Sequence, residues 1–237
     1  MNNRDNRTLL RSPVFSTKIF DTRLGENAER DGYRQIRQEI DGLGKLMQSL
    51  IDIREQKDPT KTAAAIALEY GQKFEKAQDT VKRRIERLSS ILANLSEEAD
   101  RTLIEKSGLY RNTGREAEFR EVLRGMTEKQ RKDFVKRAVD NGQPEVLSAI
   151  MDAPPELSGL TDEYVTNAKE QYIGLHFPEY ARERGLINDA AELVELAVDG
   201  FRHQSSKIRD PYLEVEADEA KKRADAADAE FKAMTRD

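Results

Sequence analysis

The sequence predicts an all-α protein in which a long antiparallel coiled-coil helical hairpin is followed by a small multi-helix module. First, apolar residues recur at intervals of three and four over two long stretches, as they do along packed helices. Second, residues 114–204 lack the period-two alternation of strands. Third, 36% charged residues stand beside only 37% hydrophobic ones, a balance that suits long solvated helices better than one large core.

Residues 1–25 are predicted to form an extended N-terminal arm. They are rich in Ser, Thr, Asn and scattered basic residues, and their short apolar patch shows no helical period. The patch comprises Val14, Phe15, Ile19 and Phe20.

The first long helix is expected from Glu26 to about Gln56. Its apolar seam alternates steps of three and four through Tyr33, Ile36, Ile40, Leu43, Met47 and Leu50. Gly42 and Gly44 interrupt this stretch, and each costs about 1 kcal/mol relative to Ala. The helix therefore needs a packed partner, and Pro59 ends it.

The second long helix is expected from Pro59 or Thr60 to about Lys106, so residues 26–107 form the hairpin. About 48 helical residues span roughly 70 Å, and this arm overhangs the first. An overhang exposes an apolar stripe, which predicts oligomerisation or docking through Leu88 to Leu103. The seam residues predicted to bind a partner are Ile36, Ile40, Leu43, Met47, Leu50, Leu88, Leu92, Leu95 and Leu103.

Residues 108–204 are predicted to form a compact acidic module of short helices. Thr127 with Gln130 reads as a capping box, and Pro144 suits a first helical position. Pro178 and Gly185 are expected to delimit one short helix, and Asp189 to open the last one.

Residues 205–237 are predicted to hold an extended segment and then a helix. The alternation in residues 212–216 favours the extended segment, and an Ala-rich charged helix follows to Met234. With so few large apolar residues, this helix is marginal alone.

Charge is unevenly distributed along the chain, although the net charge is only -5. Residues 71–137 hold 17 basic and 12 acidic side chains (+5), whereas residues 138–200 hold 3 and 13 (-10). Two interpretations stay open: the blocks pair within or between molecules, or both are solvated surfaces.

The composition argues against enzymatic, metal and cofactor chemistry. The chain has no Cys, and its two histidines, His176 and His203, have no catalytic partner in the sequence. No nucleotide-binding, serine-hydrolase or zinc-protease motif occurs. Acidic residues between Asp140 and Asp199 lack metal-ligand spacing. We expect no enzyme activity, no cofactor and no small-molecule substrate.

A basic cluster on the second helix supports the competing prediction, a nucleic-acid-associated module. It comprises Lys82, Arg83, Arg84 and Arg87. A basic helix face neutralises phosphates, but flanking charges on a coiled coil account for it equally well. The same alternatives apply to Lys129, Arg131, Lys132, Lys136 and Arg137.

Two short segments invite family comparisons. Residues 138–147 are similar to the turn between paired helices of ankyrin-like or HEAT-like repeats, but they occur once, which argues against a solenoid. Residues 142–161, with Ala-Pro-Pro-Glu-Leu-Ser-Gly-Leu at 153–160, resemble segments of phage and prophage helical proteins. This resemblance implies a virion-associated or assembly role.

Together these patterns predict a non-enzymatic structural, assembly or adaptor subunit, as a homo-oligomer or within a larger assembly. No run of about 18 apolar residues occurs and the polar N-terminus lacks a secretory signal, so we expect a soluble protein without membrane contact. It would be made in a cytoplasm and, in a phage, incorporated into the virion.

Overall fold

A computed structural model describes residues 15–55, 58–111 and 114–235, which are helical with no strand in those ranges. The prediction of an all-α protein is confirmed. The elements are α2 (Thr17–Leu24), η2 (Gly25–Glu29), α3 (Asp31–Glu55), α4 (Ala63–Ser107), α5 (Glu116–Arg124), α6 (Glu128–Asp140), α7 (Pro144–Met151), η3 (Pro155–Leu157), α8 (Asp162–His176), α9 (Pro178–Ile208) and α10 (Pro211–Met234).

The chain divides into two compact units. The first joins Met1–Leu92 with Asp189–Asp237, and the second is Ala93–Asn188. Both α4 and α9 contribute residues to each unit. The domain boundaries predicted from sequence, 26–107 and 108–204, therefore do not match these units.

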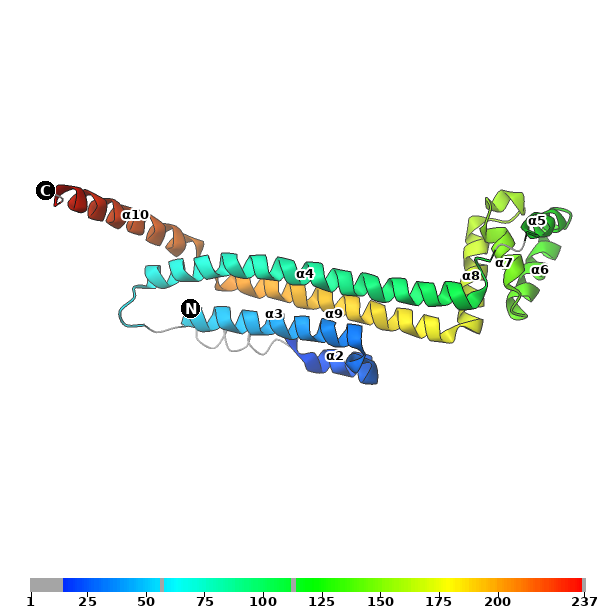
Figure 1. Ribbon diagram of the computed structural model, residues 1–237, viewed down its shortest axis with the longest axis horizontal. Coiled ribbons are helices and arrows are strands. Elements are labelled where there is room, and N and C mark those ends of the chain that lie inside the picture. Colours follow the sequence, from blue (N-terminus) through cyan, green and yellow to red (C-terminus); the bar gives the residue numbers. More distant parts are fainter. Residues whose placement is uncertain (1–14, 56–57, 112–113, 236–237) are drawn as a thin grey trace. The chain divides into compact units, whose positions relative to one another are not determined.

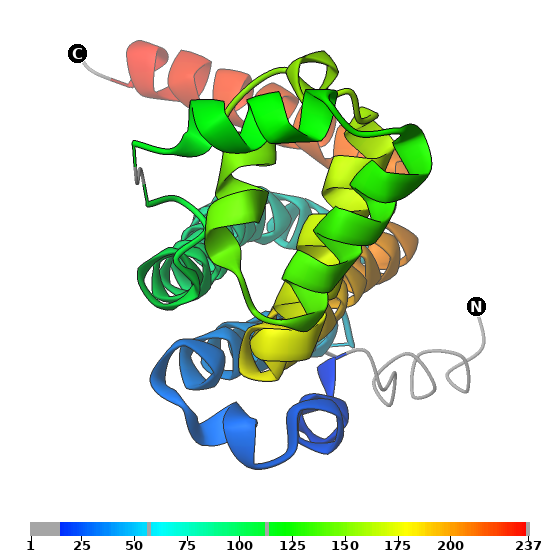
Figure 2. The same cartoon turned by 90° about the vertical axis from the view of Figure 1, so that its right-hand side faces the viewer.

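The first unit is built around three helices that run side by side: α3, the first part of α4 and the last part of α9 (Figures 1 and 2). Tyr70 of α4 is 1% exposed and donates a hydrogen bond to the Ser205 carbonyl of α9 (3.4 Å). The unit's buried apolar residues include Tyr33, Ile36, Ile40, Leu43, Met47, Leu50, Tyr70, Phe74, Ala77, Val81, Leu88, Ala190, Leu193, Ala197 and Phe201.

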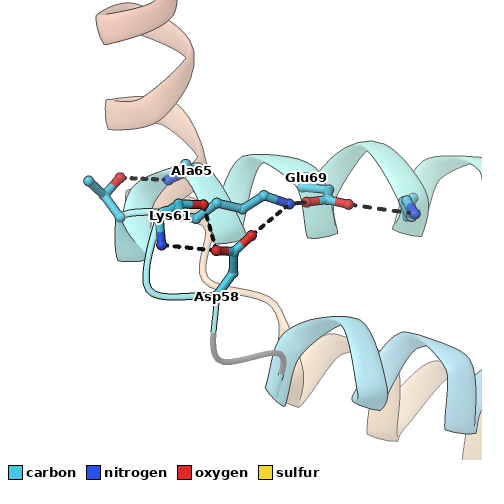
Figure 3. A network of polar contacts seen from close by, with 7 residues as sticks. Asp58, Lys61, Ala65 and Glu69 are labelled. Atoms are coloured by element: carbon cyan, nitrogen blue, oxygen red, sulfur yellow. Dashed lines mark hydrogen bonds and ion pairs between the residues drawn. The ribbon is translucent and has the colours of Figure 1, made fainter.

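The turn between α3 and α4 is held by side chains around Asp58 (Figure 3). Asp58 Oδ1 accepts hydrogen bonds from the Thr60 amide (2.9 Å) and hydroxyl (2.6 Å). Lys61 Nζ lies 2.8 Å from Glu69 Oε2, and Thr62 Oγ1 accepts from the Ala65 amide (3.2 Å). These bonds satisfy amides at the start of α4 and tie the turn to its second helical turn.

The expectation of an extended arm over residues 1–25 is wrong where the structure describes it, because Thr17–Leu24 is a helix. Phe20 and Leu24, four residues apart, are 1% and 2% exposed, so tertiary burial supports a short helix with a weak sequence pattern. The Asp21 carboxylate pairs with Arg37 of α3, at 2.8 Å from Nη2. Residues 1–14, which include Val14, lie outside the described residues.

The expected helix break near Gly185 is also wrong, because α9 is one helix of 31 residues. An interior glycine costs only about 1 kcal/mol. The hydrogen bond from the half-buried Tyr180 to Asp100 (2.6 Å) before Gly185, and the burial of Ile187 and Ala190 after it, outweigh that cost. The end of α9 packs in the first unit with α3 and α4, so the predicted two-helix hairpin acquires a third helix.

The second unit has its own apolar core. It is formed by α5 to α8 (green to yellow in Figure 2) together with Leu109, which follows α4. Tyr172 of α8 donates a hydrogen bond to the Ser107 carbonyl at the end of α4 (3.1 Å). The capping box of Thr127 with Gln130 and the N-terminal position of Pro144 are confirmed. The buried core comprises Leu109, Leu123, Val135, Ala138, Val139, Val146, Leu147, Ile150, Leu160, Val165, Ala168 and Tyr172.

The extended segment expected at residues 212–216 is wrong, because α10 is one continuous helix from Pro211 (Figure 1). The Asp210 side chain accepts a hydrogen bond from the Leu213 amide (3.3 Å), and Pro211 occupies the first helical position. An Asp cap followed by Pro is a strong helix start. It outweighs five residues of alternation.

Candidate functional site

The seam residues predicted to bind a partner lie mostly inside the chain itself. Two of the nine, Leu92 and Leu95, are half-buried. The other seven are at most 6% exposed: Ile36, Ile40, Leu43, Met47, Leu50, Leu88 and Leu103. The stripe predicted for docking on α4 is therefore buried or half-buried within the chain, and its binding of a partner stays a prediction.

Two members of the basic cluster on α4 contact a carboxylate of α3, and the other two do not. Glu39 of α3 has a side chain that is only 11% exposed, and both Arg84 and Arg87 donate hydrogen bonds to its carboxylate. The Arg87 bond, from Nη1 to Oε1, measures 2.6 Å. A Cβ atom added at Gly42 would lie 2.6 Å from the Arg84 Cζ atom, so the glycine makes room for this guanidinium.

Lys82 and Arg83, the other two members of the predicted cluster, are exposed. Arg83 donates hydrogen bonds within α4, to the Asp79 carbonyl (3.3 Å) and the Thr80 hydroxyl (3.4 Å). Two of the four cations therefore stabilise the α3–α4 contact. This leaves a reduced charge for phosphate binding.

The basic stretch on α6 lies beside acidic groups and carbonyls. Arg131 donates to the Gly159 carbonyl (2.7 Å), and Lys132 pairs with Glu128 (2.6 Å). An open groove of about 780 Å³ along this helix is lined by both signs of charge, including Asp133, Lys136, Arg137 and Asp140. Mixed charge does not make a phosphate site.

Of the two histidines, His176 packs against its neighbours and His203 lies on the surface. His176 Nε2 lies 2.6 Å from the Val139 carbonyl, and its ring packs 4.9 Å from the Tyr172 ring. His203 is exposed on α9. Within residues 15–55, 58–111 and 114–235, no three His, Asp or Glu side chains gather in a geometry that would hold a metal ion.

One small cavity is lined by a residue that carries an unsatisfied polar atom. It measures about 240 Å³ and lies between Phe15, Met47, Ile51 and Gln204. Gln204 is 5% exposed, and its Oε1 atom has no hydrogen-bond partner among the described residues. The cavity is smaller than the roughly 300–1,000 Å³ of ligand pockets. We therefore assign no ligand to it.

The strongest candidate surface is an apolar seam along α10, hereafter the α10 seam. Its residues recur at alternating steps of four and three: Leu213, Ala217, Ala220, Ala224, Ala227, Phe231 and Met234. Ala217 is buried, whereas every residue from Glu219 to Thr235 is exposed. Phe231 and Met234 are 67% and 70% exposed. Seam residues at this spacing pack against another helix in coiled coils.

The first turns of α10 are anchored to the first unit. Arg209 Nε donates to both Glu214 oxygens (2.9 and 3.1 Å), and its guanidinium lies 5.1 Å from the centre of the Phe74 ring of α4. Hydrogen bonding to Glu214 raises the pKa of Arg209 above its ordinary value. A Cβ atom added at Gly71 would lie 2.8 Å from the Glu214 carboxylate, so α10 starts close against α4.

The α10 seam was not among the predicted partner-binding residues, although its spacing is visible in the sequence. Most of its positions are alanine, which contributes little to any measure of hydrophobicity. The 4-3-4-3 spacing itself, ending in Phe231 and Met234, is the signal that identifies it.

Comparisons with protein-family models, with curated proteins and with solved structures each find no match to this chain. No helix in the described part of the chain is both long and apolar enough to cross a bilayer. The exposed surfaces of the chain are therefore the features that bear on its function.

Proposed function

We propose that this chain is a non-enzymatic assembly or adaptor subunit that docks onto a helical partner through the α10 seam. The observation that carries the proposal is the exposure of this seam, which ends in Phe231 and Met234 at 67% and 70% exposure. Burying such side chains contributes about 1.5–3 kcal/mol each. A virion component is the setting implied by the resemblance of residues 142–161 to phage helical proteins.

The marginal stability of an unpacked helix supports a docking role. Isolated helices shorter than about 12–15 residues are marginal in water, and the exposed stretch Glu219–Thr235 is only slightly longer. A partner helix would supply the tertiary packing that the stretch lacks.

Nucleic-acid binding through residues 82–87 has weaker support. Arg84 and Arg87 are both engaged by Glu39, which compensates part of their charge. A helix face that retains two free cations releases few counterions on binding phosphates, so it binds weakly at physiological salt.

Photo-crosslinking in cells that contain the natural partners tests the assembly proposal. Benzoylphenylalanine replaces Ala227 on the seam or, as a matched control, Ala229 on the opposite face of the same helix. Both alanines are exposed. We expect a covalent protein adduct from position 227 and little from position 229. Equal yields from the two positions, or none from either, would contradict docking through the seam.

A further inference from the structure

We propose that the partner of the α10 seam is the same helix of a second copy of this chain, packed antiparallel with Ala224 facing the partner's Ala227. The inference rests on the proposed docking function and identifies its partner. It follows from the order of large and small residues along the seam and from the charges that flank it.

Side-chain size favours the antiparallel arrangement. With Ala224 opposite the partner's Ala227, each Phe231 faces Ala220 of the partner subunit. Large residues then meet small ones, and the two helices keep one close spacing along the contact. In a parallel arrangement Phe231 would face the partner's Phe231 next to layers of paired alanines. The helices would be forced apart at one end, which would leave voids between the alanines.

The proposed interface continues the packing that the first turns of α10 already make within their own chain. Ala217 is 6% exposed and already packs within its own chain. In the antiparallel register Met234 of the partner subunit reaches the level of Ala217, at the edge of the first unit. The seam would then be covered from the anchored first turns of α10 to its last turn.

The charges beside the seam are complementary in the same register. Lys221 and Asp228 lie on one flank of the seam, and Arg223 and Glu230 lie on the other. Antiparallel pairing places Lys221 beside the partner's Asp228, and Arg223 beside Glu230 of the partner subunit. Twofold symmetry repeats both contacts. The present partner of Arg223, Glu219 at 3.8 Å, is an exposed neighbour on the same helix, so exchanging it costs little.

Flanking charges and seam packing have different roles in the proposed dimer. Exposed ion pairs contribute little affinity but select the partner and its orientation. Parallel helices would also bring Arg223 near the partner's Asp228, so the charges indicate self-association and the sizes of the seam residues indicate its direction.

A charge exchange tests self-association in purified full-length protein. We expect the mass of the wild-type chain, measured by sizing with light scattering, to double from 27.1 kDa between about 1 µM and about 1 mM. The variants are Lys221→Glu with Arg223→Glu, and Asp228→Lys with Glu230→Lys. Each alone places like charges at every flanking contact, and we expect at least about tenfold weaker association. Their equimolar mixture should recover the wild-type affinity.

A matched control changes the same charge away from the seam. Lys222→Glu with Lys232→Glu alters the net charge by the same amount on the outer face of α10, and its self-association should match the wild type. If it weakens association as much as Lys221→Glu with Arg223→Glu, net charge and not the flanking contacts controls the dimer, and the proposal is overturned.

Disulfide formation tests the orientation. The chain has no Cys, so engineered thiols report unambiguously. A mixture of Ala224→Cys and ¹⁵N-labelled Ala227→Cys should give mainly mixed disulfides, because bonding requires Cβ atoms about 3.5–4.5 Å apart. Ala220→Cys alone should form few disulfide-linked dimers under oxidation, since the same residue of the partner subunit lies far along the helix axis. Efficient Ala220→Cys dimers would indicate parallel helices and overturn the proposed register.

Failure of this inference is distinguishable from failure of the proposed function. A wild-type chain that stays at 27.1 kDa up to about 1 mM refutes the second copy as partner. If photo-crosslinking from position 227 then captures only a different protein, the docking function stands with another partner. If position 227 gives no adduct, both proposals fail.

Discussion

Glu39 of α3 links this helix to α4 through two arginines. Its carboxylate is nearly buried and accepts hydrogen bonds from two arginines of the neighbouring helix. Taking a carboxylate out of water is costly unless it is paired and hydrogen-bonded. Arg84 is the better shielded of the two, with a side chain 28% exposed against 63% for Arg87.

Replacing Arg84 with Ala should therefore lower the free energy of unfolding by about 2 kcal/mol, because a buried carboxylate loses a charged donor. Arg83→Ala is the matched control, since Arg83 is exposed and bonds only within its own helix turn, and it should stay within about 0.5 kcal/mol of wild type. Urea unfolding of the three proteins measures both. Equal stabilities for the two variants would show that the Glu39 contact contributes nothing net.

Glycines in the long helices have opposite roles that depend on what each one faces. Gly71 of α4 leaves room for the Glu214 carboxylate, whereas nothing lies within 4 Å of a Cβ atom added at Gly185 of α9. At an uncrowded helical position, alanine is favoured over glycine.

Gly185→Ala should raise the free energy of unfolding by about 0.5–1 kcal/mol, since it adds helix propensity without a clash. Gly71→Ala gains the same propensity but pushes into Glu214 and the start of α10, so it should be less stable than Gly185→Ala. Urea denaturation with a constant m value compares them. The prediction is wrong if Gly185→Ala destabilises the protein or if Gly71→Ala gains as much.

At the level of elements, large apolar residues made α3 and α4 predictable. The seams through Ile36 and Leu43 and through Tyr70 and Leu88 have the spacing of packed helices. The continuation of α9 through Gly185 could not be predicted from sequence. Tertiary packing stabilises the helix by more than one glycine destabilises it, and no local pattern reveals that packing. The missed seam of α10 had the right spacing, but its alanines gave a weak apolar signal.

The exposed half of α10 should exchange its amide hydrogens much faster than α3 in dilute protein. Without tertiary packing, its helical hydrogen bonds open at little free-energy cost. If α10 self-associates, protection should increase with protein concentration. Phe231→Asp with Met234→Asp should remove that increase and leave protection in α3 unchanged. Strong protection of residues 220–233 in dilute wild-type protein would contradict the exposed helix.

On the scale of the whole molecule, charge is distributed so that neighbouring segments neutralise one another in part. Asp189 and Glu192 of the acidic block lie 3.7 and 2.7 Å from Arg23 of α2. The interpretation that the acidic block pairs within the chain thus applies to these two residues, although their partner comes from the N-terminal segment and not from the basic block. All three side chains are at least 43% exposed, so these pairs contribute little stability.

The pH dependence of stability follows from groups in both units. Hydrogen bonds from Thr60 hold the pKa of Asp58 below its ordinary 3.8, and the bond from Lys61 holds the pKa of Glu69 below 4.5. A carboxyl group with a lowered native pKa stabilises the fold above its unfolded pKa and loses that contribution as the pH falls through the native one. Stability should therefore decrease below about pH 4.5.

At alkaline pH, groups with raised pKa values make stability fall as the pH rises. Burial raises the pKa of Tyr70 to about 12, and burial with the Asp100 hydrogen bond (2.6 Å) raises the pKa of Tyr180 to about 12, from an ordinary 10.0. Their neutral forms stabilise the native state below pH 10, and this contribution is lost as the pH rises toward 12.

Urea unfolding across the pH range should accordingly show a plateau with losses at both ends. Tyr70→Phe should remove part of the alkaline loss, about 1–2 kcal/mol, because phenylalanine cannot ionise. At neutral pH, Tyr70→Phe should lower the free energy of unfolding by less than this, because it removes only one long hydrogen bond, to Ser205 (3.4 Å). Tyr212→Phe is the matched control, since Tyr212 is 89% exposed, and its profile should follow the wild type. If Tyr70→Phe also follows the wild type above pH 10, the buried hydroxyl is not what limits stability there.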